Sequence, residues 1–292
     1  MIKPSVDYRQ FRFSKLNTPE FSHVWLLLYW PLFGLGFSYV ERFYPVAHYI
    51  NMHCALDDLI PFNEWFLIPY MFWFVYLIGA VAYTFFFDVP GFRRMMRFVM
   101  ITYSVTLIIY FLFPTCQMLR PEVFPRDNAL TRFIAGFYVF DTNTNVCPSL
   151  HVIGSMAAFF AFWYAPIFSK RGWRIASTVA AFFISISTVF MKQHSILDVA
   201  AAIPLCAIGY YFAYVRTPKN PAAPCRMSPD KKLHPQKLRS LLRMLLLYGS
   251  FPLFFCIYSR IIAYFCEFSA FRMHICAPCI ERRRKFRHFL SF

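Results

Sequence analysis

The sequence predicts an all-α membrane protein in which six transmembrane helices form one domain. Hydrophobic residues make up 59% of the 292 residues and charged residues only 15%, which is far more apolar than the composition of soluble proteins. Apolar runs of about 20 residues, the length that crosses the hydrocarbon core as a helix, recur along most of the chain. Short clusters of Lys and Arg separate these runs, as is typical of multi-pass membrane proteins.

The expected spans alternate with polar connections. We expect residues 1–20 not to be a cleaved signal peptide, because they contain no short apolar core followed by a small-residue cleavage site. Their basic residues predict a cytoplasmic amino-terminal segment. The six-helix domain is expected at residues 21–215. Residues 41–63 are interpreted as an interfacial turn or amphipathic helix, and residues 115–147 as a long polar connection. The spans are expected at residues 21–40, 64–87, 98–114, 149–168, 175–191 and 196–214.

The positive charge predicts the orientation of these spans. The formal net charge is +16, and every basic cluster falls on one side of a six-span arrangement, which is therefore the cytoplasmic side. The connections at residues 41–63, 115–147 and 191–195 are then expected to lie together on the opposite face. Short basic clusters between apolar runs favour contact with anionic lipid and argue against nucleic-acid binding. The clusters are Lys3, Arg9, Arg12 and Lys15, then Arg93, Arg94 and Arg97, then Lys170, Arg171 and Arg174, and finally residues 216–239.

The carboxyl-terminal residues 216–292 are interpreted as a basic cytoplasmic tail. Within it, residues 241–271 are apolar enough for a seventh span, but they contain Arg243 and Arg260 and a basic run follows them. An amphipathic or re-entrant segment at the cytoplasmic face fits these charges better than a seventh span, which would place the basic run outside.

Three groups of polar residues are expected on the non-cytoplasmic side. Arg120 follows the third span, Ser149 and His151 open the fourth, and His194 opens the sixth with Asp198 one helical turn away. Each group has an ordinary structural alternative, because an interfacial Arg often anchors a helix, a Ser often caps one, and a His is tolerated at the membrane surface.

Together these residues suit phosphoryl transfer without a metal or a cofactor. His194 would attack phosphorus, Asp198 would orient the imidazole and stabilise its positive charge, and His151 would protonate the leaving oxygen. Arg120 would bind phosphate oxygens, and Ser149 with the backbone amides that open the fourth span would donate further hydrogen bonds.

The order Arg-Pro, Pro-Ser-x-His and His-x-x-x-Asp on consecutive helix ends resembles the type 2 phosphatidate phosphatase and vanadium haloperoxidase superfamily. The resemblance covers about residues 98–214. It implies a six-helix bundle of the lipid phosphatase type. It also implies that Arg120 and Ser149 bind phosphate, that His151 is the acid, and that His194 is the nucleophile with Asp198 as its partner.

The chain departs from the phosphatase pattern at several positions. Phe113 stands where the pattern has a Lys, Thr188 stands where it has an Arg, and Leu150 replaces a Gly between the Ser and the His. Pro-Ser-Leu-His and the reduced third motif are more similar to the branch that includes inositol phosphorylceramide and sphingomyelin synthases. Lys192, two residues before His194, either replaces part of the lost positive charge at the phosphate or anchors the helix at the interface.

The expected function is that of a membrane phosphatase or phosphotransferase. It would act on a lipid phosphate ester or phospholipid at the extracytoplasmic face, in the plasma membrane, through a phosphohistidine. Transfer of the phospho-headgroup to a lipid alcohol shares the first half of this reaction and stays an alternative. Two other hypotheses are a non-catalytic lipid-binding or transport protein, and an interaction protein that acts through its basic tail.

Other residues carry weaker signals. Cys116 and Cys147 bracket the outer connection and would pair in an oxidising compartment. His274, Cys276 and Cys279 form half of a zinc or redox pattern, without a second ligand pair. Asp141, Asn143 and Asn145 are interpreted as headgroup contacts or as turn residues. A further set is interpreted as solvated polar residues rather than as a metal site: His48, His53, Asp57 and Asp58.

Overall fold

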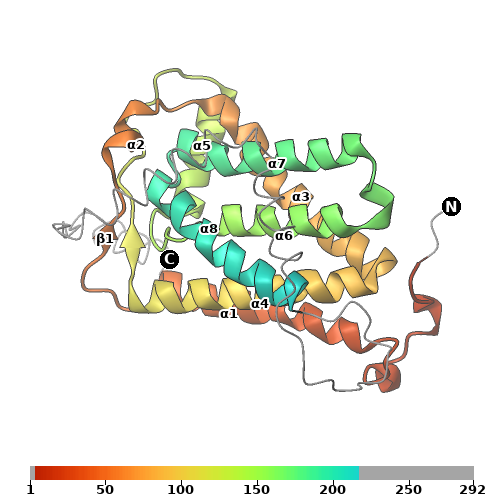
Figure 1. Ribbon diagram of the computed structural model, residues 1–292. Coiled ribbons are helices and arrows are strands. Elements are labelled where there is room, and N and C mark those ends of the chain that lie inside the picture. The colour runs from red at the N-terminus through yellow and green to blue at the C-terminus, as the bar shows by residue number, and fades with distance from the viewer. Residues whose placement is uncertain (1–3, 217–292) are drawn as a thin grey trace. The chain divides into compact units, whose positions relative to one another are not determined.

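A computed structural model describes residues 4–216 of the chain, and this part is mostly helical (Figure 1). The expected tail at residues 217–292, its apolar segment at 241–271 and the His274, Cys276 and Cys279 pattern lie outside the described residues.

Five helices in the described part are long and apolar enough to cross a membrane, which fits a multi-pass membrane protein. The first begins with the 3-10 helix η3 (Ser22–Leu28) and continues as α1 (Tyr29–Arg42). The second joins η4 (Glu64–Phe66) to α3 (Leu67–Phe87). The others are α4 (Val89–Leu112), α7 (Arg171–Phe190), and α8 (Ile196–Tyr210) with its π-helical continuation Tyr211–Val215.

Three boundaries differ from the sequence prediction by four residues or more, and one of them is the start of α7, at Arg171 rather than at residue 175. Helix α4 begins at Val89 rather than at residue 98, so that the Arg93 cluster lies in its first turns. The Asp88 carboxylate accepts a hydrogen bond of 2.9 Å from the backbone N–H of Gly91 and thereby caps the helix. The fourth expected span is the 15-residue helix α6 (Leu150–Tyr164), which ends before Pro166. At 1.5 Å per residue α6 is about 22 Å long, shorter than the roughly 30 Å hydrocarbon core.

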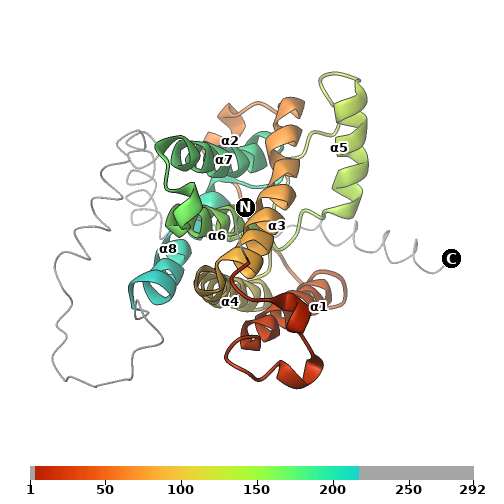
Figure 2. The same cartoon turned by 90° about the vertical axis from the view of Figure 1, so that its right-hand side faces the viewer.

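Helix α6 lies at the centre of the bundle. It packs against α3, α4, α7 and α8, while α1 packs on α4. Figures 1 and 2 show these long helices running side by side around α6. Ile153, Ala157 and Ala158 of α6 are fully buried. The small Ala157 and Ala158 let the neighbouring helices approach closely.

The three connections predicted to share one face do lie together, at one end of the bundle. Strand β1 (Ile50–Asn51) pairs in parallel with β2 (Thr115–Cys116), which joins the first connection to the second. The Gln117 side chain donates to the backbone carbonyl of Lys192 at 2.8 Å, which joins the second connection to the third. The first connection also contains the short helix α2 (Ala55–Leu59). Three other short helices in the described part are Tyr8–Gln10, Phe13–Lys15 and Pro166–Phe168.

Sequence reasoning missed one helix, α5 (Ala129–Phe140), inside the connection expected to be irregular. Asn128 caps it by accepting from the backbone N–H groups of Leu130 and Thr131, both at 3.0 Å. This Asn-x-x-Thr capping box, followed by an apolar run, was the signal in the sequence. Figure 2 shows α5 standing beside the main bundle, and Figure 1 shows it at the end where the connections gather.

Candidate active site

His194 and Asp198 form the pair that their spacing predicts. The Nδ1 atom of His194 lies 3.0 Å from Oδ2 of Asp198, and Asp198 is fully buried. The same Oδ2 accepts a 3.0 Å hydrogen bond from the backbone N–H of Ser195, the residue that caps α8. A carboxylate at Nδ1 favours the tautomer with the proton on Nδ1, which leaves the Nε2 lone pair for chemistry.

A second buried carboxylate, Asp57 of α2, holds the start of α8. Its Oδ2 accepts from the Ser195 hydroxyl at 2.6 Å, and its Oδ1 accepts from the backbone N–H of Ile196 at 2.9 Å. It also caps its own helix by accepting from the backbone N–H of Cys54 at 2.9 Å. The interpretation of Asp57 as a solvated residue is therefore wrong, because these donors, one from α2 and two from the start of α8, satisfy a carboxylate that is fully buried.

His151 reaches the same site from the first turn of α6. Its ring centroid lies 5.7 Å from that of His194, and the two planes are inclined by 67°. Two aromatic rings of α3 hold the imidazole in place, Tyr70 at 4.5 Å and Trp73 at 4.6 Å between centroids. The two histidines thus come from different helices, with their rings close enough for one small group to contact both.

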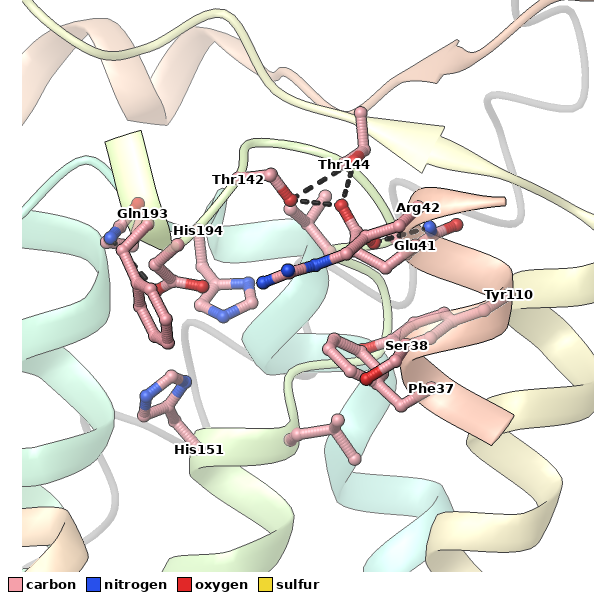
Figure 3. A pocket seen from close by; sticks show the side chains of 15 residues that line it. Phe37, Ser38, Glu41, Arg42, Tyr110, Thr142, Thr144, His151, Gln193 and His194 are labelled. Atoms are coloured by element: carbon pink, nitrogen blue, oxygen red, sulfur yellow. Dashed lines mark hydrogen bonds between the residues drawn. The ribbon is translucent and has the colours of Figure 1, made fainter. Parts of the chain in front are cut away.

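Both histidines line a pocket of about 260 Å³. Figure 3 shows His151 and His194 on one side of it and residues of α1 and α4 on the other. The volume is slightly below the roughly 300 to 1,000 Å³ of typical small-molecule sites, so the pocket has room for a headgroup and not for a whole lipid. Its lining consists of Phe37, Ser38, Glu41, Arg42, Tyr110, Phe140, Asp141, Thr142, Thr144, Asn145, Val146, Leu150, His151, Gln193 and His194.

Arg120 does not line this pocket. Its guanidinium donates to the backbone carbonyls of Tyr138 at 2.9 Å, Asp141 at 2.6 Å and Thr142 at 3.0 Å, and to the side-chain oxygen of Gln193. It also lies 4.3 Å from the centre of the Tyr138 ring. Arg120 therefore ties the end of α5 and the loop after it to the turn that carries His194.

Lys192 also points away from the pocket lining. Its Nζ donates to the backbone carbonyl of Asp57 at 2.7 Å, and only 8% of the residue is exposed. Burial lowers the pKa of Lys192, against the raising effect of the nearby Asp57 and Asp58 charges. A left-handed backbone with φ of 52° turns the chain here between α7 and α8.

Ser149 is fully buried at the N-cap of α6 and does not line the pocket. Its backbone N–H donates to the backbone carbonyl of Asp198 at 3.1 Å, which joins the starts of α6 and α8. Within the described part of the chain its hydroxyl has no hydrogen-bond partner. Buried hydroxyls are nearly always bonded, so this one has unused capacity to donate.

Comparison with protein family models, curated proteins and solved structures finds no match to this chain.

Sequence reasoning missed the contribution of α1, whose last two residues line the pocket. Glu41 is buried, with 6% exposure, and accepts from the hydroxyls of Thr142 and Thr144 and from the side-chain amide of Asn145, the last at 2.6 Å. Arg42 follows it, and Figure 3 shows its side chain extending across the pocket toward the side where His194 lies. Nothing in the local pattern around residues 41 and 42 distinguishes them from an ordinary charged helix end.

Asp141, Asn143 and Asn145 differ in role. Asp141 lines the pocket and accepts from the Tyr70 hydroxyl at 2.8 Å and from the Gln193 amide at 3.1 Å. Asn145 also lines it, bound to Glu41. Asn143 instead donates to the backbone carbonyl of Gln117 at 2.7 Å and stabilises the loop.

The remaining candidates do not line the pocket. Cys116 and Cys147 are free thiols, so the expected disulfide is absent. Burial, with the neighbouring Asp198 charge, raises the pKa of the Cys147 thiol. His53 pairs with Asp58 at 2.8 Å on the surface. Over residues 4–216, no cluster of three or more His, Cys, Asp or Glu side chains suits a metal ion.

Proposed function

We propose that this protein is a membrane phosphatase or phosphotransferase of the phosphatidate phosphatase superfamily, acting on a lipid phosphate ester through a phosphohistidine. The observation that carries the proposal is the His194 and Asp198 pair with His151 beside it in one pocket. A carboxylate-held imidazole is an activated nucleophile, and a second imidazole within reach of the same small group is suited to proton transfer.

The reaction would proceed in two steps. In the first, Nε2 of His194 bonds to phosphorus while the ester P–O bond breaks, and protonated His151 gives its proton to the leaving lipid oxygen. Asp198 stabilises the positive charge that His194 acquires. In the second, a water or alcohol oxygen attacks phosphorus, the P–N bond breaks, and His151 takes the proton of the attacking group. Both imidazoles return to their starting state.

The resemblance implies phosphate binding by Arg120 and Ser149, and Lys192 is the residue that would replace part of the missing positive charge or anchor the helix at the interface. The buried Ser149 hydroxyl has donor capacity for a phosphate oxygen that reaches the base of α6. Arg120 and Lys192 donate to protein oxygens instead, so phosphate binding by either would exchange those hydrogen bonds for bonds to substrate. Their present bonds favour a role in holding the His194 turn.

The proposed topology has six spans, with α6 as the shortest. Helix α6 starts beside α8 and connects through residues 165–170 to α7, whose far end returns to the His194 turn. A helix covered on all sides by α3, α4, α7 and α8 is shielded by protein and does not need the full length of the hydrocarbon core. The positive-inside rule then puts the site outside, on a plasma membrane whose cytoplasmic leaflet supplies anionic lipid to the basic clusters.

The test is incubation of purified protein with a phosphate-labelled phospholipid. We expect release or transfer of the label by the wild type and its loss in His194→Ala and His151→Ala. His53→Ala is the matched control, because His53 is half-buried, pairs with Asp58 and does not line the pocket. Undiminished turnover in both site variants would refute the mechanism, and binding without any product would favour a lipid-binding or transport protein.

Headgroup transfer to a lipid alcohol is the second candidate. The two positions where the phosphatase pattern has cations favour this candidate, because Phe113 and Thr188 are uncharged. The Thr188 side chain is also buried, and its hydroxyl donates to the backbone carbonyl of Ser185 at 2.8 Å. The same assay distinguishes the two when a lipid alcohol is added. Label that moves to the alcohol, without free phosphate, identifies a transferase.

A further inference from the structure

The pocket contains both histidines of the proposed reaction, and the two cations that the sequence assigned to the phosphate do not line it. Arg120 donates to protein oxygens, and so does the Lys192 ammonium. A phosphate ester carries negative charge, which is costly to place in a half-enclosed site without a cation. A permanent cation in the pocket lining would therefore come from another part of the chain.

Arg42 is the one Lys or Arg among the described residues that line the pocket. It is the last residue of α1, and Figure 3 shows its guanidinium directed across the pocket toward the His194 side. A group bound between His194 and the α1 wall would lie against it. The planar guanidinium can form two parallel hydrogen bonds to two phosphate oxygens, which Lys cannot do.

Glu41 fixes the position from which Arg42 extends. Its carboxylate binds Thr142, Thr144 and Asn145, so the end of α1 is joined to the loop that follows α5. The other carboxylate in the lining, Asp141, is bound by Tyr70 and Gln193. Both acidic groups are thus engaged by donors of the protein, and a bound anion meets Arg42 with less repulsion from them.

We infer that Arg42 is the phosphate-binding cation of this site, supplied by the first helix rather than by the motifs around the histidines. The inference rests on the proposed function for its substrate class, a phosphate monoester or diester of a lipid. It assigns Glu41 as a positioning residue, which acts through the loop and through its neighbour Arg42.

The experiment measures binding and turnover separately, with dioctanoyl phosphatidic acid as the probe. Turnover is measured with full-length Arg42→Gln and Arg42→Lys. Binding of the labelled probe is measured in the His194→Asn background, with and without each change. Arg132→Gln is the matched control, because Arg132 is an exposed Arg on α5 that pairs with Asp127 at 2.8 Å. It removes the same charge from the same end of the protein without altering the pocket.

We expect Arg42→Gln to raise the KM and the Kd for the probe by about 10- to 100-fold, as loss of a charge-assisted pair does. Arg42→Lys should fall between it and the wild type, and Arg132→Gln should stay within about 2-fold of the wild type. Binding of dioctanoylglycerol, which has no phosphate, should not depend on Arg42. Thermal unfolding of each variant shows whether it is folded. If Arg42→Gln does not fold, Arg42→Lys is compared with the wild type in its place.

The outcomes separate this inference from the proposed function. Turnover and binding that do not change in Arg42→Gln overturn the role of Arg42 and leave the histidine mechanism standing. Phosphate-dependent binding that needs Arg42, in a protein that never turns the probe over, supports Arg42 and overturns the proposed reaction. If Arg132→Gln weakens binding and turnover of the probe as much as Arg42→Gln does, the effect comes from general surface charge, and the inference is overturned.

Discussion

Replacement of Asp57 by Ala should impair both folding stability and catalysis, although Asp57 does not line the pocket. The change removes the acceptor of three buried donors: the backbone N–H groups of Cys54 and Ile196, and the Ser195 hydroxyl. An orphaned buried donor costs about 1 to 3 kcal/mol. Because the Ser195 hydroxyl can rotate to another acceptor, we expect a total near the lower end, about 3 kcal/mol. Asp57→Asn keeps one acceptor oxygen and should cost about half as much.

The catalytic effect follows from the position of Asp57 at the start of α8. Ser195 and Ile196, which it binds, directly follow His194. A shift of about 1 Å in a reacting group can cost on the order of 100-fold in rate, so kcat should fall by about that factor, while KM stays within about 3-fold. Thermal unfolding and steady-state kinetics in the same detergent measure both effects. Asp58→Asn is the control, because Asp58 is exposed and pairs with His53. An Asp57→Ala protein as stable and active as Asp58→Asn would refute this account of α8.

Three further predictions concern Arg120, Asp141 and Gly154. Arg120→Gln should lower the unfolding temperature more than Arg132→Gln does, because Arg120 bonds to four protein oxygens whereas Arg132 pairs with Asp127 on the surface; weaker phosphate binding at unchanged stability would instead make Arg120 a phosphate ligand. Burial raises the pKa of Asp141 above its ordinary value of 3.8, so the folded state keeps a proton that the unfolded state releases. The free energy of unfolding should therefore fall as pH rises above 3.8. Asp141→Asn should abolish this dependence of the unfolding temperature on pH. Gly154→Ala would place a methyl 2.7 Å from the Tyr103 hydroxyl and 2.8 Å from Trp73 Nε1, which should cost about 1 to 3 kcal/mol and displace the ring that packs on His151. Gly79→Ala, with open space at that position, should not lower the unfolding temperature, and equal effects of the two changes would contradict the packing argument.

The parts of the fold that follow from local pattern were predictable from the sequence. Apolar runs located the long helices between residues 22 and 215, although not α5, and the pairing of His194 with Asp198 followed from a spacing of four residues on a helix. The alternation of the expected spans with polar connections placed residues 41–63, 115–147 and 191–195 together at one end. The start of α4 was misjudged because three Arg residues in its first turns resemble a loop, whereas the Asp88 cap makes them helical.

The missing parts of the site depend on contacts between residues far apart in the chain. Asp57 meets Ser195 across 138 residues, and Glu41 meets Asn145 across 104. No period or motif encodes such a contact, so both carboxylates look like surface residues in the sequence. Arg120 was predicted as a phosphate ligand on the order of its motif alone. The acceptors around it, which include the carbonyl of Asp141, become visible only when the loop after α5 is folded.

The central claim is that His194 carries the phosphoryl group between the lipid and its acceptor. The most direct measurement is a rapid denaturing quench of the full-length protein during a single turnover of phosphate-labelled dioctanoyl phosphatidic acid, followed by mapping of the label on the chain. The account predicts an acid-labile, base-stable label on His194 that forms and decays as product appears, and no label in His194→Asn. Product formed at the wild-type rate by His194→Asn, or formed by the wild type without any labelled protein, would contradict it.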